Sequence, residues 1–261
     1  MSKEKLINTT VRGDSAKRLQ QLLLDYHYHR LAVATHPLRD ELDYLGDWQM
    51  TRLKRTHHDL YHDPRYHEAL DFLLRDLYAP KEFGQRDDDV ERIFPVVVKL
   101  LPDHALYTVA SLVELNLLSQ QLDLFLTEVL FNQLQIHEIT EQAYIEAYRR
   151  CNNLNLRLHQ IQLIANIGND LEKYVHSRLL LTTLKMTRKP AEMAGLGQLH
   201  SFLQRGFNAF RQIGDVNLLL DCVIQRETGI LERIFADHPL PFELTETEQK
   251  GPARANAWQA S

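Results

Sequence analysis

A chain of 261 residues that is 44% hydrophobic and 25% charged has a globular composition, and at this length about three quarters of the unfolded chain's surface can be buried. The net charge of −5 is spread unevenly, but residues 1–67 still hold only 11 Lys and Arg against 9 Asp and Glu. That balance is far from the dense basic face that phosphate binding needs, so no nucleic acid partner is expected. The two cysteines are far apart and no segment is apolar over the length of a membrane span or a secretory leader, so we expect a soluble cytoplasmic protein with no membrane contact.

Helix breakers are scarce, with 10 Gly and 9 Pro, and the 65 residues between Pro102 and Gly168 contain neither. Apolar residues recur there at helical spacing, and no alternating strand pattern or hairpin turn is present. We therefore predict an all-α fold, a single bundle of about eight to ten helices. Three parts are expected, namely a flexible N-terminus at 1–14, a helical bundle at 15–236 and a mobile, disordered C-terminal tail at 237–261.

The first helices are expected at 15 to 36, 38 to 62 and 63 to 78, because proline disfavours a helical residue before it and favours a helix start after it. Pro95 should kink or divide the next helix. Helix starts further on are expected after the N-cap residues Asp103, Ser119, Thr140 and Asp215, and at Pro190. The predicted core comprises Phe72, Leu77, Phe94, Val97, Leu101, Val109, Leu118, Leu122, Phe207 and Phe210.

The segment FLLRDLYAPKEFGQRDDD, residues 72–89, combines a large apolar face with a run of charge. The structural interpretation is an amphipathic helix ended by Ala-Pro, followed by carboxylates that suit the positive end of the next helix. In that interpretation charge-assisted hydrogen bonds of Arg86 and Asp87 hold the helix to its neighbours. The alternative is a ligand site formed by Arg75 and Asp76 together with Arg86 and Asp87.

The stretch FLLRDLYAPKEF closely resembles the signature of a bacterial family called FFLEELY-motif proteins. The resemblance continues through WQMTRLKRTHHDLYHDPRY, RDDDVERIFPVVVKLLP, LSQQLD, PAEMAGLGQLHSFLQRGFNAF and RETGILERIF, roughly positions 38 to 235. This chain departs from the signature at Leu73, Arg75 and Ala79. Because the family carries no established activity, the resemblance implies no functional residues.

The densest cluster of potential ligands is THHDLYHDPRYH, residues 56–67. His58 and His62 are four residues apart and share a helix face, which is the spacing with which two imidazoles bind one metal, and Asp59 lies between them. The sequence has no HExxH, and Asp59-x-x-His62 is its only acid-x-x-His, whereas a di-iron bundle needs that pattern twice. A metal site at His58, Asp59 and His62 is therefore a hypothesis, and exposed helix-end histidines are the ordinary interpretation.

Two further clusters invite a functional interpretation. Glu172 and His176, next to Asp170, form an acid–histidine pair at helical spacing that could join Asp25 and His29 in a ligand set, although ordinary surface pairing is the interpretation we prefer. In FLQRGFNAFRQIGD, three phenylalanines near one face are typical of a core. Beside Arg205 and Arg211 they could instead line a pocket for an anionic, partly apolar ligand.

No nucleophile elbow, phosphate-binding loop or dinucleotide motif is present in the sequence. We therefore favour a non-enzymatic helical protein that binds a protein partner or a small ligand. The alternative is a metal-dependent helical enzyme, di-iron oxygenase-like or an HD-type hydrolase, that uses the histidine-rich segment 57–67. The sequence names no cofactor and no oligomeric state.

Overall fold

The computed structural model describes residues 2–77 and 83–249, and within these ranges the chain is all-α, 81% helical, with no strands and with 10 helices of seven or more residues. This confirms the predicted fold class. The longer helices of the first half are α1 (Ser2–Asn8), α2 (Asp14–Ala34), α3 (Arg39–Thr56), α6 (Phe83–Leu100) and α7 (Asp103–Glu128). Those of the second half are α8 (Glu141–Cys151), α9 (Leu154–Val175), α10 (Arg178–Met193), α11 (Gly197–Arg211) and α12 (Val216–Phe235). Short pieces are α4 (His58–Tyr61), α5 (His67–Phe72), α13 (Glu246–Gln249) and π-helical turns at Leu73–Leu77 and Val129–Gln133.

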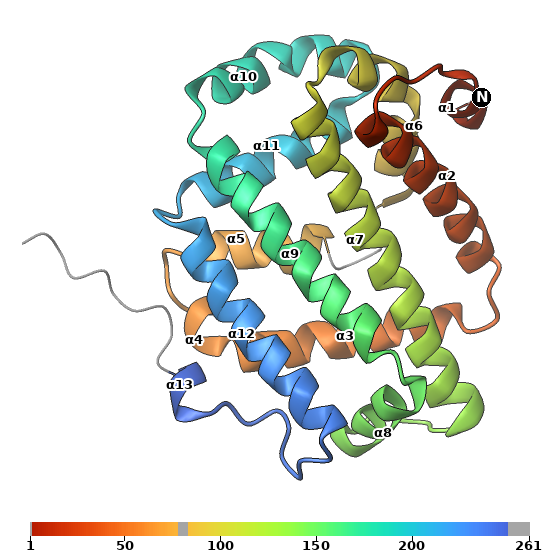
Figure 1. Ribbon diagram of the computed structural model, residues 1–261, viewed down its shortest axis with the longest axis vertical. Helices are drawn as coiled ribbons and strands as arrows, with labels where there is room; N and C mark the ends of the chain where they lie inside the picture. Colours follow the sequence, from red (N-terminus) through yellow and green to blue (C-terminus); the bar gives the residue numbers. More distant parts are fainter. Residues whose placement is uncertain (1, 78–82, 250–261) are drawn as a thin grey trace, which may run out of the picture.

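Four long helices, α2, α7, α9 and α12, lie side by side along the length of the molecule (Figure 1). Helices α3, α5 and α11 cross behind them, and α1 packs against α6 at one end. Gly168 lies inside α9 where that helix meets α12, because a Cβ there would come within 2.4 Å of Leu220 Cδ1. The glycine therefore allows close packing of two helices and does not end one.

Several helix ends differ from the sequence prediction for local chemical reasons. Thr140 and Asp215 do cap α8 and α12, accepting hydrogen bonds from Ala143 N and Leu218 N. Ser119 starts no helix, because its hydroxyl donates to the Leu115 carbonyl inside the unbroken α7. Pro95 and Pro190 lie inside α6 and α10, and Asp63 forms a turn with Arg65 ahead of α5.

The core prediction is confirmed for the residues whose side chains are buried and wrong for Leu101. That leucine is 37% exposed because it lies in the bend between α6 and α7. The side chain of Leu77 lies outside the described part of the chain. Buried members of the predicted core are Phe72, Phe94, Leu122, Phe207 and Phe210, and half-buried ones are Val97, Val109 and Leu118.

Both chain ends differ from the expectation of loose segments wherever they are described. Leu6 of α1 is completely buried and belongs to a core cluster with α2, α6 and α7. Residues 237–249 turn back along the bundle and end in α13, where the Glu248 side chain is buried. The remainder of the expected tail, residues 250–261, lies outside the described ranges.

The aromatic side chain that opens the signature stretch packs against α11. The Phe72 ring lies 5.2 Å from the ring of Phe202 and 6.2 Å from that of Phe210. A Cβ at Gly206 would be 2.6 Å from Phe72 Cζ, so the glycine gives the ring its place. The phenylalanines of α11 are therefore part of the core, in agreement with the ordinary interpretation of that segment.

Replacing Gly206 by alanine should lower the free energy of unfolding by about 1–3 kcal/mol, because the added methyl group overpacks the Phe72 ring. Gly46→Ala is the matched control, because that glycine lies inside α3 with nothing within 4 Å of an added Cβ. There the gain in helix propensity should raise stability by roughly 0.5–1 kcal/mol. Urea unfolding of both variants measures the difference, and equal effects would contradict the packing account.

Candidate functional site

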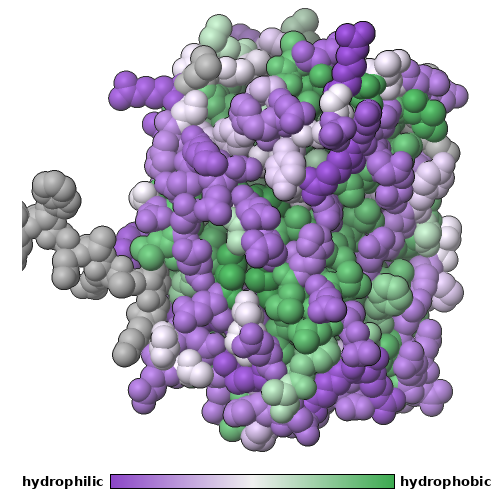
Figure 2. Space-filling model, viewed as in Figure 1, coloured by the Kyte–Doolittle hydropathy of each residue, from purple (hydrophilic) through white to green (hydrophobic). Residues whose placement is uncertain are grey.

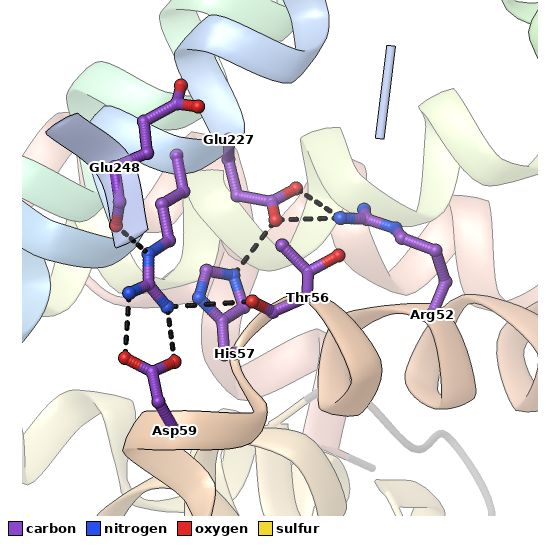
Figure 3. A network of polar contacts seen from close by, with 7 residues as sticks. Arg52, Thr56, His57, Asp59, Glu227 and Glu248 are labelled. Atoms are coloured by element: carbon purple, nitrogen blue, oxygen red, sulfur yellow. Dashed lines mark hydrogen bonds and ion pairs between the residues drawn. The ribbon is translucent and has the colours of Figure 1, made fainter. Parts of the chain in front are cut away.

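Buried charged residues join α3, α4 and α12 in a network that the sequence interpretation did not assemble (Figure 3). It forms where α3 ends, because the backbone turns at His57 before α4 begins and this directs the imidazole inward. We call it the α3–α12 network and define it by Arg52, Thr56, His57, Asp59, Arg226, Glu227 and Glu248.

Glu227 accepts hydrogen bonds from Arg52, which lies in α3, and from His57, the residue that follows α3. Arg52 Nη1 lies 2.7 and 2.6 Å from its two carboxylate oxygens, and His57 Nε2 lies 2.9 Å from Oε1. Because the carboxylate can only accept, His57 carries its proton on Nε2 in this contact. The side chains of Arg52 and His57 are 9% and 6% exposed, so the interaction is shielded from water.

The ion pair fixes the protonation of its members. Burial raises the pKa of the Glu227 carboxyl, but the charge of Arg52 and the hydrogen bonds from His57 and Arg52 outweigh it and hold the pKa at about 2. Burial also lowers the pKa of Arg52, and the Glu227 charge more than restores it, so the net shift is upward. Both groups are charged at neutral pH.

Arg226, whose side chain is 1% exposed, forms the second half of the network. Its two terminal nitrogens bind the two oxygens of Asp59 at 2.6 and 2.8 Å in a parallel fork. One of them also reaches the carbonyl of Thr56, the last residue of α3, at 3.5 Å, and Nε donates to the Glu248 carbonyl at 3.0 Å. One guanidinium thus binds α4, the C-terminal end of α3 and the segment after α12.

The network has little capacity for nucleophilic chemistry. Burial raises the pKa of the nearby Cys222 thiol, which therefore stays protonated. Desolvation raises the pKa of Asp59, but the hydrogen bonds and the charge of Arg226 lower it by more. The net pKa is below its ordinary value, so that carboxylate stays ionised and paired. In the described geometry two buried arginines are paired with carboxylates, of which Glu227 is largely shielded and Asp59 is half exposed, and these pairs fix the positions of the helices.

The histidines predicted as metal ligands lie at the edge of this network. His58 and His62 are exposed, their ring centres lie 4.0 Å apart, and His62 Nδ1 donates to the His58 carbonyl. Asp59 faces Arg226 with both oxygens. Within residues 2–77 and 83–249 no group of three His, Cys, Asp or Glu side chains could hold a metal ion.

The other acid–histidine clusters form ordinary local pairs. His176 bonds to Glu172 at 3.0 Å, and Glu172 also accepts a hydrogen bond from Val216 N at the start of α12. Asp25 accepts a hydrogen bond from Gln21 in its own helix, and among the described residues it belongs to no group of three potential metal ligands. Burial lowers the pKa of His29, which favours its neutral form.

Three of the six predicted ligand-binding residues have side chains that the structure describes, and all three are exposed. Arg75 is exposed and pairs with Asp71 one turn earlier, while Arg205 and Arg211 are exposed on α11. The side chains of Asp76, Arg86 and Asp87 lie outside what the structure describes. A ligand-binding role for these residues stays a prediction.

Helix α6 carries two buried carboxylates, Asp89 and Glu91. Glu91 bonds to His27 Nδ1 at 2.8 Å and faces Arg30 at 3.7 Å, while Asp89 pairs with Arg92. Glu91 therefore joins α6 to α2, while the Asp89 pair lies within α6.

Sequence reasoning missed Arg52, Arg226, Glu227 and Glu248, although a signal was present. Arg52 shares the buried face of α3 with Leu45, Gln49 and Thr56 at helical spacing. The same holds for Arg226 on α12, seven residues after Leu219 and four before Ile230. A charge on an apolar helix face predicts a buried partner elsewhere in the chain.

Fold and network together define an all-α bundle whose crossing helices are joined by buried ion pairs. A family model described as Domain of unknown function (DUF8198) matches residues 28–241, and the chain belongs to this family. No curated protein and no solved structure matches the chain. None of the helices in the described ranges combines the length and apolarity that crossing a bilayer requires.

The folded state holds the Glu227 pKa at about 2 against an ordinary value of 4.5, so its ion pair stabilises the protein above about pH 4.5 and is lost as the pH falls toward 2. We expect Glu227→Gln to lower the free energy of unfolding at neutral pH by roughly 3 kcal/mol, with the deficit shrinking as the solution is acidified. Urea unfolding at several pH values measures it. Glu232→Gln, an exposed glutamate on the same helix, is the control, and a deficit that does not depend on pH would contradict the assignment.

Metal analysis tests the histidine hypothesis directly. Protein purified without a His tag should hold no full equivalent of iron, manganese or zinc, because two adjacent imidazoles without a third ligand bind metal weakly. The content should be the same in His58→Ala/His62→Ala. A full equivalent that disappears in this double variant would overturn the expectation.

Proposed function

We propose that this protein is a non-enzymatic helical bundle that binds a partner protein, and that α10 carries the binding surface. The supporting observation is the pair Met186 and Met193, which are 74% and 89% exposed. They are seven residues apart on one helix and therefore share a face. Flexible thioether side chains on an exposed helix face are typical of protein-binding surfaces.

The inner side of α10 is already used by the fold. Its half-buried leucines at 180, 181 and 184 face the bundle, and His200 of α11 donates to the Leu184 carbonyl at 2.8 Å. Helix α10 contacts α11 and α9 at one end of the molecule (Figure 1). Its outer methionines therefore need no change in the bundle to meet a partner.

Charge indicates the chemistry of that partner. Lys185 and Lys189 are exposed beside the methionines, and α10 carries four basic residues against the single acid Glu192. The 261 residues together are acidic, with a net charge of −5. A partner with an apolar groove bordered by acidic side chains fits this helix.

A second apolar surface is visible in Figure 2, where apolar residues gather in the middle of the face formed by α9 and its neighbours. Leu112 of α7 and Leu158 of α9 are each 38% exposed, about half as much as the methionines. Their neighbours His159 and Glu114 form a hydrogen bond of 2.8 Å across the two helices. This contact favours helix packing over partner binding at that surface.

The metal-dependent enzyme remains the alternative, and it uses the histidine-rich segment 57–67 as a di-iron oxygenase-like or HD-type site. It requires ligands beyond His58 and His62. The metal analysis described above decides between the two proposals. A small ligand in place of a partner protein is the other form of the binding proposal.

Site-specific cross-linking tests the surface in cells that naturally produce the protein. A photo-reactive phenylalanine derivative in place of Met186 should give a discrete adduct with another protein, whereas the same group in place of the exposed Gln142 of α8 should not. Met186→Ser/Met193→Ser should then reduce recovery of that protein at least about tenfold without changing the melting temperature. Adducts that are the same from both positions, or recovery that is unchanged, would contradict the proposal.

A further inference from the structure

The chain after α12 lies on the bundle as a bound peptide would. From Asp237, which has a positive φ of 59°, it runs in an irregular path to the single turn of α13. Pro241 and Glu248 are buried and Phe242 is half-buried, whereas residues 245–247 between the anchors are exposed. Buried anchors separated by exposed positions are typical of peptide recognition.

The aromatic anchor enters a site built by α3 and α8. The Phe242 ring lies 6.1 Å from the ring of Tyr144 and 5.8 Å from the guanidinium of Arg52. Trp48 stacks on Tyr144, with the two ring centres 4.4 Å apart. These side chains belong to the bundle and form an aromatic wall for one planar ring.

The acidic anchor enters a cradle on α12. Glu248 Oε1 lies 3.1 Å from Arg233 Nη1, and a Cβ on Gly229 would be 2.1 Å from that oxygen, so the space exists only because residue 229 has no side chain. Thr245 N, in the segment itself, binds the other carboxylate oxygen at 2.7 Å. Burial raises the pKa of Glu248, but hydrogen bonds from Thr245 and Arg233 bring it below the ordinary value, so the anchor is charged.

Two arginines of α12 also hold the main chain of the segment. Arg226 Nε donates to the Glu248 carbonyl and Arg233 Nε to the Pro241 carbonyl, each at 3.0 Å. Both Nε groups bind main-chain carbonyl oxygens and no side chain. A different peptide with the same backbone path can therefore accept the same two hydrogen bonds. Without an occupant, the described partners of the Arg233 guanidinium would be absent, and burial of an unpaired charge is costly.

We propose that this face, formed by Trp48, Arg52, Tyr144, Gly229 and Arg233, is a docking site for an acidic segment of a partner protein. That segment carries a proline–aromatic pair and a glutamate six residues after the aromatic ring, as Pro241, Phe242 and Glu248 do here. The chain's own segment then acts as a tethered competitor whose effective concentration a partner must exceed. The site is separate from the outer face of α10, so either proposal stands without the other.

The probe is a fluorescent peptide with the sequence of residues 238–249, titrated against the full chain in an anisotropy assay. Wild type should bind it weakly, and Phe242→Ala/Glu248→Gln, which weakens the tethered segment, should bind at least about tenfold more tightly. A peptide with Glu248→Gln should lose most of that affinity, whereas Glu246→Gln, an exposed glutamate of the same segment, should not. In the weakened chain Gly229→Ala should abolish binding and Gly46→Ala should preserve it.

Hydrogen exchange on the wild-type chain provides a measurement that needs no variant to fold. Excess peptide should speed exchange of the amides in 241–249, and the Glu248→Gln peptide should not. A folded weakened chain that binds neither peptide, or both equally, would overturn the docking site. Dimerisation of the wild type that Gly229→Ala prevents would assign the face to a second copy and overturn the choice of a partner protein.

Discussion

The guanidinium of Arg226 is the contact on which the arrangement of the C-terminal half depends. It donates two hydrogen bonds to Asp59 of α4, one to the Thr56 carbonyl at the end of α3 and one to the Glu248 carbonyl of the returning chain. A buried ion pair is a weak source of net stability, but a buried charge that has lost its partner costs several kcal/mol. The network therefore acts mainly through specificity, because packings of α3 against α12 that separate these charges are penalised. The next residue of α12, Glu227, is bound by both Arg52 and His57. The adjacent residues Arg226 and Glu227 therefore set the position of α12 relative to α3.

Helical periodicity and breaker scarcity were enough to predict the all-α class, and side-chain caps were enough to place the starts of α8 and α12. Elsewhere local chemistry has two solutions. The Ser119 hydroxyl satisfies itself on the preceding turn of α7 as readily as it would cap a new helix. Pro190 is tolerated inside α10, where the sequence suggested a start. The π-helical turn at Leu73–Leu77 follows the expected helix period only in part, and the apolar pattern of the sequence does not distinguish it from a helix end.

The site was harder to predict than the fold because its contacts are distant along the chain. Arg52 and Glu227 are separated by 175 residues, and Asp59 and Arg226 by 167. Hydrophobic periodicity tells which side of a helix is buried, but it does not tell which distant helix faces it. The four-residue spacing of His58 and His62 predicts two imidazoles on one helix face, whereas the buried imidazole is that of the neighbouring His57. One residue of register, set by the break between α3 and α4, separates the exposed rings from the buried one.

Segments that lie far apart in the sequence pair with one another in three dimensions. Phe72 packs on Gly206 of α11, and Arg52 of α3 pairs with Glu227 of α12. Phe72, Gly206, Arg52 and Glu227 are therefore used in contacts between helices. Of the two proposed binding surfaces, the outer face of α10 lies apart from these pairs, whereas the face that residues 241–248 cover includes Arg52 of one pair. The proposed surface on α10 presents apolar and basic side chains, whereas the proposed face formed by α3, α8 and α12 holds an aromatic ring and a carboxylate, so the two surfaces suit partners of different chemistry.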